Sequence, residues 1–470
     1  MADECRELIL QRVRERGRVT FAEFMDLALY HPECGYYARA PVRSGRSGDF
    51  FTSVDLGPLF GELLGVQLAE MWRILSRQSP VDNRQSPADN RQSPVDSRQS
   101  TVSQQSPVDS QQSRSTGDSR PLGATLAPGA RHLAPGSDYE TLGAAPAPSA
   151  QRRAPSFDLV EAGAGSGRLA RDILDHAARR DPELYLAIRL HLVERSPAAR
   201  AQQERVLGPH ANKLAGAGAD VPDGVEGVIF ANELLDALPA HVVVMRDDGL
   251  REVFVEADGS RLVERADVPS TPEIAEYFAR SGARLQPGWR AEVNLAAEGW
   301  IRDAARRLRR GFLLLIDYGH PSAELYSATH RAGTLTAFYR HTAETGPAQA
   351  GASAWLTRPG ECDITSHVDL TMVQRTAEQE GLETLCVVDQ GYFLASLGVA
   401  AGLDSEGSGR GSGVCTTEPP PNPVAMLRRR LALKTMMLPG GMGSTHKALL
   451  FARGVGRPAL IGCPRGARLT

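Results

Sequence analysis

One short stretch, FDLVEAGAGSG at residues 157–167, constrains the fold of this chain more than any other. The letters FDLV are typical of a buried strand, and Glu161 follows them. The next residues, 168–180, carry apolar side chains spaced four apart, which predicts an amphipathic helix. Glycines allow sharp turns and the close approach of a ligand, and helix N-terminal amides can meet a polar group, so this order opens a nucleotide-type site. The glycines between strand and helix alternate with other residues: Gly163, Gly165 and Gly167.

The spacing of these glycines separates two kinds of ligand. The dinucleotide fingerprint is G-x-G-x-x-G, and it opens on a pyrophosphate. Here the pattern is E-x-G-x-G-x-G, which resembles the first motif of S-adenosylmethionine (SAM)-dependent methyltransferases. That ligand has no phosphate and carries a cationic sulfonium and an amino group, which suit the acid Glu161. For this segment alone, a glycine-rich turn that binds nothing is the alternative interpretation.

Composition and the N-terminus exclude several classes of protein. The chain has 470 residues and a formal net charge of −3, so we expect two or more domains and no nucleic-acid partner. No apolar run reaches membrane-spanning length, so we expect no membrane partner. The first residues, MADECRELILQRVRERG, contain early acids and no signal-peptide core. We therefore expect a bacterial cytoplasmic protein rather than one of the mitochondrial matrix. The six cysteines are scattered without a C-x-x-C pair, which predicts no disulfide framework and no metal site.

Local composition changes sharply along the chain. The segment RQSPVDN repeats every seven residues and then gives way to a stretch rich in Pro, Ala, Gly and Ser. Too little apolar surface is present there to offset the entropy of ordering, so we expect disorder. A tolerated loop expansion explains it more simply than a partner-binding or phosphorylated linker does. The expected segments are an N-terminal helical lobe over the cofactor site (1–76), the disordered insertion (77–154), the core (155–403), a flexible linker (404–424), the C-terminal part of the core (425–455) and a loose tail (456–470).

Strand and helix patterns alternate after residue 156, which is typical of a parallel α/β sheet. The helix 294–311 leads into GFLLLIDYG, the most apolar strand. Residues 320–361 look like a loop. The other expected strands lie at 158–163, 189–196, 383–391 and 443–454 and within 227–239, where an apolar VIF run precedes a polar turn. We also expect β-hairpins at 241–265 and a further helix at 367–382.

Two groups of polar residues follow expected strands. In open α/β sheets, ligands bind beyond the carboxyl ends of the strands. Glu194 ends the second strand, where a carboxylate can accept hydrogen bonds from both ribose hydroxyls of SAM or of NAD. Asn232, Glu233 and Asp236 follow the VIF strand, where a transferred methyl group would meet its acceptor. The alternatives are a solvated acid at Glu194 and a short helix, capped by Asn232, with its acids in solvent.

The acids after the VIF strand suit a cationic acceptor. Carboxylates orient an amine or guanidinium through charge-assisted hydrogen bonds. A side chain cannot easily deprotonate arginine, so an enzyme that methylates it would use acids to aim the nitrogen and disperse its charge. Positioning would then supply most of the rate.

Four other positions are candidates for the site. His367, in CDITSHVDLT, could be a pocket histidine oriented by Asp369, or Asp369 could cap a helix. Asp317 and Tyr318 end an apolar strand and could line a pocket. Asp49, in SGRSGDFFTS, could act as a lid or clamp, although an ordinary turn also explains it.

Longer motifs resemble one family, the MidA-like relatives of the mitochondrial complex I assembly methyltransferases. The resemblance covers residues 21–454 and implies a Rossmann-like class I methyltransferase sheet with a helical lobe over the cofactor site. It also implies SAM as cofactor and a protein arginine as acceptor. The insertion and the linker depart from the family pattern. The segments that carry the resemblance are FAEFMDLALYHPECGYY, SGRSGDFFTS, PLFGELLG, LVEAGAGSGRLARDIL, HLVERSP, FANELLDALPAH, LLLIDYGHP, GTLTAFYRH, PGECDITSHVDLT and LPGGMGSTHKALLFARG.

The resemblance and the residue patterns together give a set of roles. We assign cofactor binding to Glu161, Gly163, Gly165, Gly167, Glu194, Asn232 and Asp49. We assign catalysis to Glu233, Asp236 and His367. We expect a protein arginine methyltransferase, with a complex I subunit as acceptor in relatives. A homodimer is left open. The rivals are an NAD-dependent oxidoreductase, a non-catalytic SAM-binding assembly factor and a small-molecule methyltransferase.

Overall fold

The computed structural model describes residues 2–39, 52–77, 156–340, 342–346, 353–401, 422–438 and 441–464. Residues 78–154 of the predicted disordered insertion (77–154), most of the predicted linker 404–424 and Asp49 lie outside these described residues, whereas residue 77 lies within them. All elements below belong to the described part of the chain.

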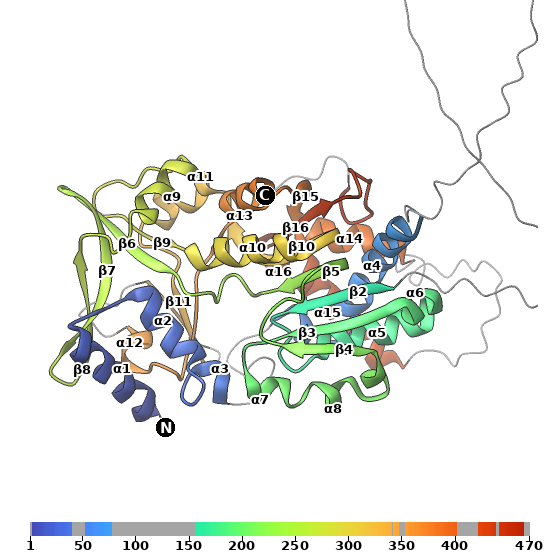
Figure 1. The fold of residues 1–470 in the computed structure, drawn as a ribbon, viewed down its shortest axis with the longest axis horizontal. Helices are drawn as coiled ribbons and strands as arrows, with labels where there is room; N and C mark the ends of the chain where they lie inside the picture. The colour runs from blue at the N-terminus through green and yellow to red at the C-terminus, as the bar shows by residue number, and fades with distance from the viewer. Residues whose placement is uncertain are drawn as a thin grey trace, which may run out of the picture. The chain divides into compact units, whose positions relative to one another are not determined.

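The largest sheet has eight strands. Seven follow the order β15–β16–β10–β5–β2–β3–β4 (Figure 1), and β14 pairs with β10. Strands β4, β3, β2, β5 and β10 run parallel, and β16 lies antiparallel between β10 and β15. This topology confirms the predicted Rossmann-like α/β sheet. The bounds are β2 (Phe157–Ala162), β3 (Ile188–Val193), β4 (Leu214–Gly218), β5 (Val225–Asn232), β10 (Leu308–His320), β14 (Val368–Asp369), β15 (Glu383–Asp389) and β16 (His446–Arg453).

Helices cover both faces of this sheet because successive strand residues point to opposite sides. Leu159, Val228 and Leu314 belong to the core on one face, with side chains of α4, α5, α14 and α15. Val160 and Ile229 belong to the core on the other face, with α10 and α13. The bounds are α4 (Leu59–Arg77), α5 (Arg168–Arg180), α10 (Leu295–Arg307), α13 (Leu370–Gln379), α14 (Gln390–Ala400) and α15 (Pro423–Met437).

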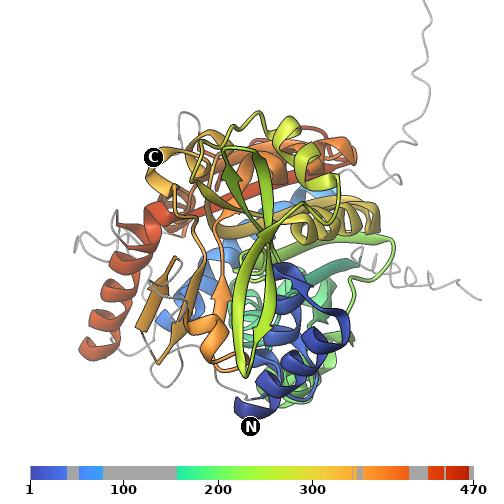
Figure 2. The same cartoon turned by 90° about the vertical axis from the view of Figure 1, so that its left-hand side faces the viewer.

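A second sheet, of five strands, packs against the N-terminal helices, which lie beside β7 and β8 in both views (Figure 2). The buried face of α2 includes Phe21, Phe24 and Met25. In contrast, α4 packs in the core of the large sheet. The division of the chain into an N-terminal lobe and a core stays a prediction. The bounds are α1 (Ala2–Arg16), β1 (Val19–Thr20), α2 (Phe21–Tyr30), β6 (His241–Arg246), β7 (Gly249–Asp258), β8 (Arg261–Asp267) and β9 (Arg290–Val293).

The prediction of a loop at residues 320–361 was wrong. This segment contributes two strands to a three-stranded sheet, in the order β12–β11–β13. Its strands are only three or four residues long and lack the apolar alternation that marks longer strands, so sequence patterns gave no signal. The bounds are α11 (Ser322–Leu325), η4 (Ala328–His330), β11 (Thr336–Tyr339), β12 (Thr342–Thr345), α12 (Ala354–Thr357) and β13 (Asp363–Thr365).

The chain end and the cysteines also depart from expectation. Up to residue 464 the predicted loose tail is packed, because the amides of Ile461 and Gly462 donate 2.9 Å hydrogen bonds to side chains of α4 and Leu460 is buried. Cys463 forms a disulfide with Cys386 of β15, which corrects the prediction that no disulfide is present. Local spacing could not indicate this pair, because the two cysteines are 77 residues apart in the sequence.

No described helix combines the length and the apolar character that a membrane span needs. The remaining elements are short and connect the larger ones: α3 (Tyr36–Arg39), η1 (Ser53–Leu56), α6 (Pro182–Ala187), α7 (Pro197–Arg200), α8 (Gln203–Leu207), η3 (Gly208–Lys213), α9 (Glu273–Ser281) and α16 (Met442–Thr445).

Candidate active site

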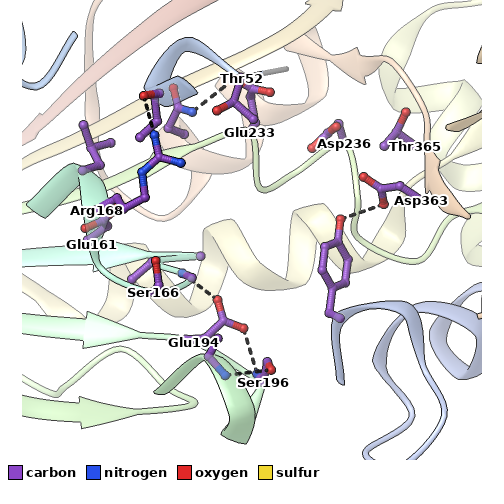
Figure 3. A pocket seen from close by; sticks show the side chains of 18 of the residues that line it. Thr52, Glu161, Ser166, Arg168, Glu194, Ser196, Glu233, Asp236, Asp363 and Thr365 are labelled. Carbon is purple, nitrogen blue, oxygen red and sulfur yellow. Dashed lines mark hydrogen bonds between the residues drawn. The ribbon is translucent and has the colours of Figure 1, made fainter. Parts of the chain in front are cut away.

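A cavity of about 1010 Å³ lies at the carboxyl ends of β2, β3, β5 and β10. Glu161, Ser166 and Glu194 lie toward one end of it in Figure 3, and Asp236 and Asp363 lie toward the other. The cavity therefore has two halves, each of which contains acidic side chains. The predicted site residues that line it are Glu161, Gly163, Gly165, Glu194, Asn232, Glu233, Asp236 and His367. Gly167 lies just behind, at the start of α5, and Asp49 is outside the described residues.

The glycine turn between β2 and α5 needs its glycines for their backbone conformation. Gly163, Gly165 and Gly167 have φ values of 70°, 51° and 85°, which disfavour L side chains. A Cβ on Gly165 would meet no atom within 4 Å, so the backbone conformation rather than crowding demands glycine there. A Cβ on Gly167 would come within 3.1 Å of Leu192, so this glycine also permits close packing of α5 on β3.

Glu194 is fixed against this turn. Its Oε2 accepts a 2.9 Å hydrogen bond from the amide of Gly165, and its Oε1 accepts one of 2.8 Å from the amide of Ser196 (Figure 3). Each carboxylate oxygen has further acceptor capacity for a ligand hydroxyl. These contacts join the ends of β2 and β3 and disfavour the alternative of a freely solvated acid.

Glu161 is a buried acid in the same half of the cavity as Glu194. Its Oε2 accepts a 3.1 Å hydrogen bond from the amide of Ala170 in α5. Burial raises its pKa to about 8, against the lowering effect of that hydrogen bond. A carboxyl group with this raised pKa is mostly protonated at neutral pH, and a cation bound beside it favours its charged form.

The loop after β5 carries Asn232 and Glu233. Residues 233–240 are not helical, so the alternative of a capped helix with solvent-facing acids is wrong. Glu233 has a φ of 51°, and its Oε1 accepts hydrogen bonds from Asn232 Nδ2 at 3.2 Å and from the amide of Ser53 at 3.3 Å. Oδ1 of Asn232 is buried and has no hydrogen-bond partner among the described residues.

Asp317 holds this loop in shape. Its Oδ2 accepts hydrogen bonds from the amides of Leu234 and Leu235 at 3.1 and 2.8 Å. The amide of Glu233 also donates to the carbonyl of Ile316 at 2.8 Å. These bonds offset the strain of the positive φ at Glu233, which typically costs about 1–3 kcal/mol. Burial raises the pKa of Asp317 well above its usual range, and Asp236 adds to that effect.

Asp236 is the central acid of the other half. Its Oδ2 accepts a 2.5 Å hydrogen bond from the hydroxyl of Tyr318, and its Oδ1 is buried with no partner among the described residues. Burial raises the pKa of Asp236 to about 7, with a further contribution from Glu233. An unpaired buried acceptor beside a second acid is suited to a donor that carries positive charge.

His367 lines the same half, but Asp369 does not orient it. Asp369 caps α13 by accepting bonds from the amides of Thr371 and Met372, so the helix-cap alternative is the one observed. Burial, together with the neighbouring histidines, lowers the pKa of His367 to about 4, so the ring is neutral near pH 7.

Several residues that line the cavity were not predicted from the sequence, among them Tyr37, Arg168, Asp363 and His446. Tyr37 donates a 2.8 Å hydrogen bond to Asp363 Oδ1, and Arg168 forms a 2.8 Å ion pair with Asp55. His446 lies with its Nε2 3.7 Å from Glu233 Oε1. Two of these residues had a signal in the sequence that could have indicated them. Arg168 directly follows the glycine turn at Gly167, and His446 lies at one end of the strand β16.

This combination of sheet, glycine turn and strand-end acid defines a nucleoside-binding α/β enzyme. The chain belongs to the family of S-adenosyl-L-methionine-dependent methyltransferases, whose model matches residues 144–388. SAM is therefore its cofactor, and the residues present fit it. No atom lies within 4 Å of where a Cβ on Gly165 would be, which leaves room for a ligand beside the turn. The carboxylate of Glu194 can accept hydrogen bonds from hydroxyl groups. Oδ1 of Asn232, which has no partner among the described residues, can accept one from an N–H donor.

Curated relatives and a solved structure are consistent with this family. The chain is 24% identical to the protein arginine methyltransferase NDUFAF7 homolog, mitochondrial, of Drosophila melanogaster, over 84% of this chain and 74% of that protein. It is 26% identical to the protein arginine methyltransferase NDUFAF7, mitochondrial, of Mus musculus, over 83% and 73%. These relatives confirm the predicted family resemblance.

The fold is shared with a solved structure of a COG1565 superfamily member from Burkholderia thailandensis bound to S-adenosyl-homocysteine. The TM-score is 0.71 at 24% sequence identity, and the alignment covers 99% of this chain and 96% of that chain.

Proposed function

We propose that this methyltransferase transfers the methyl group of SAM to an arginine of a protein substrate. The observation that carries the proposal is the buried Oδ1 of Asp236, which has no hydrogen-bond partner among the described residues. Glu233 and Asp363 line the same cavity. We call the end with Asp236 and Asp363 the acceptor half and the end with Glu161 and Glu194 the cofactor half. A guanidinium group offers five N–H donors in a fixed plane and a permanent positive charge, so it matches closely spaced acids.

In this proposal the cofactor half binds SAM through main-chain and acidic groups. Glu194 accepts hydrogen bonds from the ribose hydroxyls, and the turn containing Gly163, Gly165 and Gly167 allows close approach of the ligand. Glu161 and Asn232 face the cationic amino-acid part. SAM supplies an electrophilic methyl group on a sulfonium, whose positive charge is lost on transfer. Asp49, from the loop outside the described residues, stays a proposed clamp.

The acceptor half orients the nucleophile. Glu233 and Asp236 aim one guanidinium nitrogen, and Tyr318 holds Asp236 in place through its 2.5 Å hydrogen bond. The acids also stabilise the charge that remains on the acceptor during transfer. His367, the third predicted catalytic residue, also lines the cavity.

The names of the curated relatives support an arginine acceptor, because both are described as protein arginine methyltransferases. A respiratory complex I subunit is the first candidate that the family resemblance implies. A bacterial cytoplasmic location, a homodimer and the absence of nucleic-acid or membrane partners remain part of the proposal.

Labelled methyl transfer tests this function. The purified chain is incubated with SAM carrying a tritiated methyl group and with a lysate of its own host, then proteins and small molecules are separated. The proposal expects label in a protein band and, after acid hydrolysis, in methylated arginine. Label in small molecules alone would assign a small-molecule methyltransferase instead. SAM binding without any labelled product would assign a non-catalytic assembly factor.

A further inference from the structure

Three histidines lie close together beside the cavity, and two of them, His320 and His367, line it. His320 ends β10, His330 ends η4, and His367 lies between β13 and β14. One ring nitrogen from each lies within 4.8 Å of the others. The ring centroids are 4.7 Å apart for His320 and His330, 5.2 Å for His320 and His367, and 5.8 Å for His330 and His367.

The surrounding contacts orient two of these rings. Glu324 Oε1 lies 3.0 Å from Nδ1 of His320, and the Glu324 carbonyl oxygen lies 3.1 Å from Nδ1 of His330. In that arrangement Nδ1 carries the proton, so the Nε2 lone pair of each ring is free to bind a ligand. Metal-binding histidines typically donate their second nitrogen to a carboxylate or a carbonyl in this way.

The third ring has an unmet bonding requirement. Nδ1 of His367 is buried and lacks a hydrogen-bond partner within the described part of the chain. A buried polar atom without a partner costs free energy unless a ligand supplies one. The cluster therefore offers one ring nitrogen from each of three histidines within 4.8 Å of one another, and Glu324 orients two of the three rings.

We propose that His320, His330 and His367 bind one divalent transition-metal ion of the zinc class. Three histidines with an open fourth position are a recurrent zinc site. Zn–N bonds of about 2.0–2.1 Å in a tetrahedral site require the nitrogens to be about 3.4 Å apart, so small side-chain rotations would close the cluster around the ion.

The ligand set also decides which metals are excluded. Imidazole suits Zn²⁺, Ni²⁺ and Cu²⁺, whereas Mg²⁺ and Ca²⁺ require oxygen ligands. His320 and His367 also line the main cavity, so the open position of the ion faces the acceptor half. The ion would thus place a positive charge next to the acids of that half. The site does not depend on which acceptor the enzyme methylates.

Metal titration of the full-length chain tests the site. The protein is stripped with a chelator, and Zn²⁺ is then titrated in competition with a chromophoric chelator, with Mg²⁺ as a separate probe. We expect one equivalent of Zn²⁺ to bind tightly and Mg²⁺ not to bind. His330→Ala should lower the Zn²⁺ affinity at least 100-fold. Glu324→Gln, which removes only the orienting carboxylate, should lower it about 10- to 100-fold.

A matched control separates this site from adventitious binding. His176 lies on α5, packed against α4, so His176→Gln should bind Zn²⁺ like the wild type. Circular dichroism of each variant confirms that it is folded. Because His330 is partly exposed on a short element, its replacement should leave the fold intact. Absence of Zn²⁺ binding to the wild type, or equal binding by the wild type and His330→Ala, would overturn the proposal.

Discussion

The backbone amide of Gly165 donates a 2.9 Å hydrogen bond to the carboxylate of Glu194. This bond joins the glycine turn after β2 to the end of β3, two segments that are 29 residues apart in the chain. The carboxylate thereby fixes the turn and presents its remaining lone pairs to the cavity. Both effects should contribute to SAM affinity.

Replacement of Glu194 by alanine should therefore weaken SAM binding. The variant loses the acceptor for the ribose hydroxyls and leaves the amides of Gly165 and Ser196 unpaired. The expected loss is about 1–3 kcal/mol, or about 5- to 150-fold in Kd. Isothermal titration with SAM measures it, with Glu204→Ala on the exposed side of α8 as control. An unchanged Kd in Glu194→Ala would contradict the ribose role.

Glu161 should release a proton when SAM binds. Its pKa is raised to about 8 by burial, so near pH 7 it is mostly protonated, and a bound cation favours the ionised form. Titrations in buffers of different ionisation enthalpy report the number of protons released. We expect net release in the wild type and SAM affinity that rises with pH toward 8. Equal proton release by Glu161→Gln would rule out this origin.

The same residue should affect stability. The pKa of Glu161 is higher in the folded chain than its ordinary value of 4.5, so the folded state binds more protons between these values. Its contribution is fully present below about pH 4.5 and is lost as the pH rises through about 8. The free energy of unfolding, measured by denaturation across this pH range, should fall more steeply with pH for the wild type than for Glu161→Gln. Parallel curves would contradict the raised pKa.

Glu233→Gln should abolish most turnover while SAM still binds. The substitution keeps the shape of the side chain but removes the charge that orients a cationic acceptor. Loss of a preorganised electrostatic contact typically lowers kcat about 100- to 1,000-fold. Glu226→Gln, at the opposite end of β5, serves as the control. Full activity in Glu233→Gln would contradict the proposal that the Glu233 carboxylate orients the methyl acceptor.

The pH dependence of kcat/KM should report Asp236. Its pKa is raised to about 7 by burial, and the proposed role needs the ionised form. At saturating SAM, kcat/KM for the protein acceptor should therefore rise with pH up to about 7 and then level off. Asp236→Asn should lose this limb along with most of the activity. A wild-type profile that is flat between about pH 5 and about pH 8 would argue against this assignment.

Much of the site was predictable because strand ends are local features. An apolar run followed by glycines or acids located β2, β3 and β5 together with Glu161, Glu194 and Glu233. The sheet topology then explained why residues far apart in sequence meet. The partners of those residues were not predictable in this way. Tyr37 reaches Asp363 across 326 residues, and no local pattern encodes that contact.

The short elements and the cysteines show the same limit. Strands β11–β13 are too short for a periodicity signal, and they form only through pairing with one another. The pairing of Cys386 with Cys463 and the histidine cluster both depend on the fold bringing distant residues together. Local spacing predicted neither, since it registers only neighbours in the chain.

Methyl transfer to a defined arginine tests the central claim most directly. The protein labelled in the host lysate is purified, incubated with the enzyme and SAM, and mapped by mass spectrometry, alongside a version in which the modified residue is replaced by lysine. We predict that methyl groups appear on one arginine and that the lysine version and the Glu233→Gln enzyme give no product. Methylation of a different residue type, or of small molecules only, would contradict the proposed arginine acceptor.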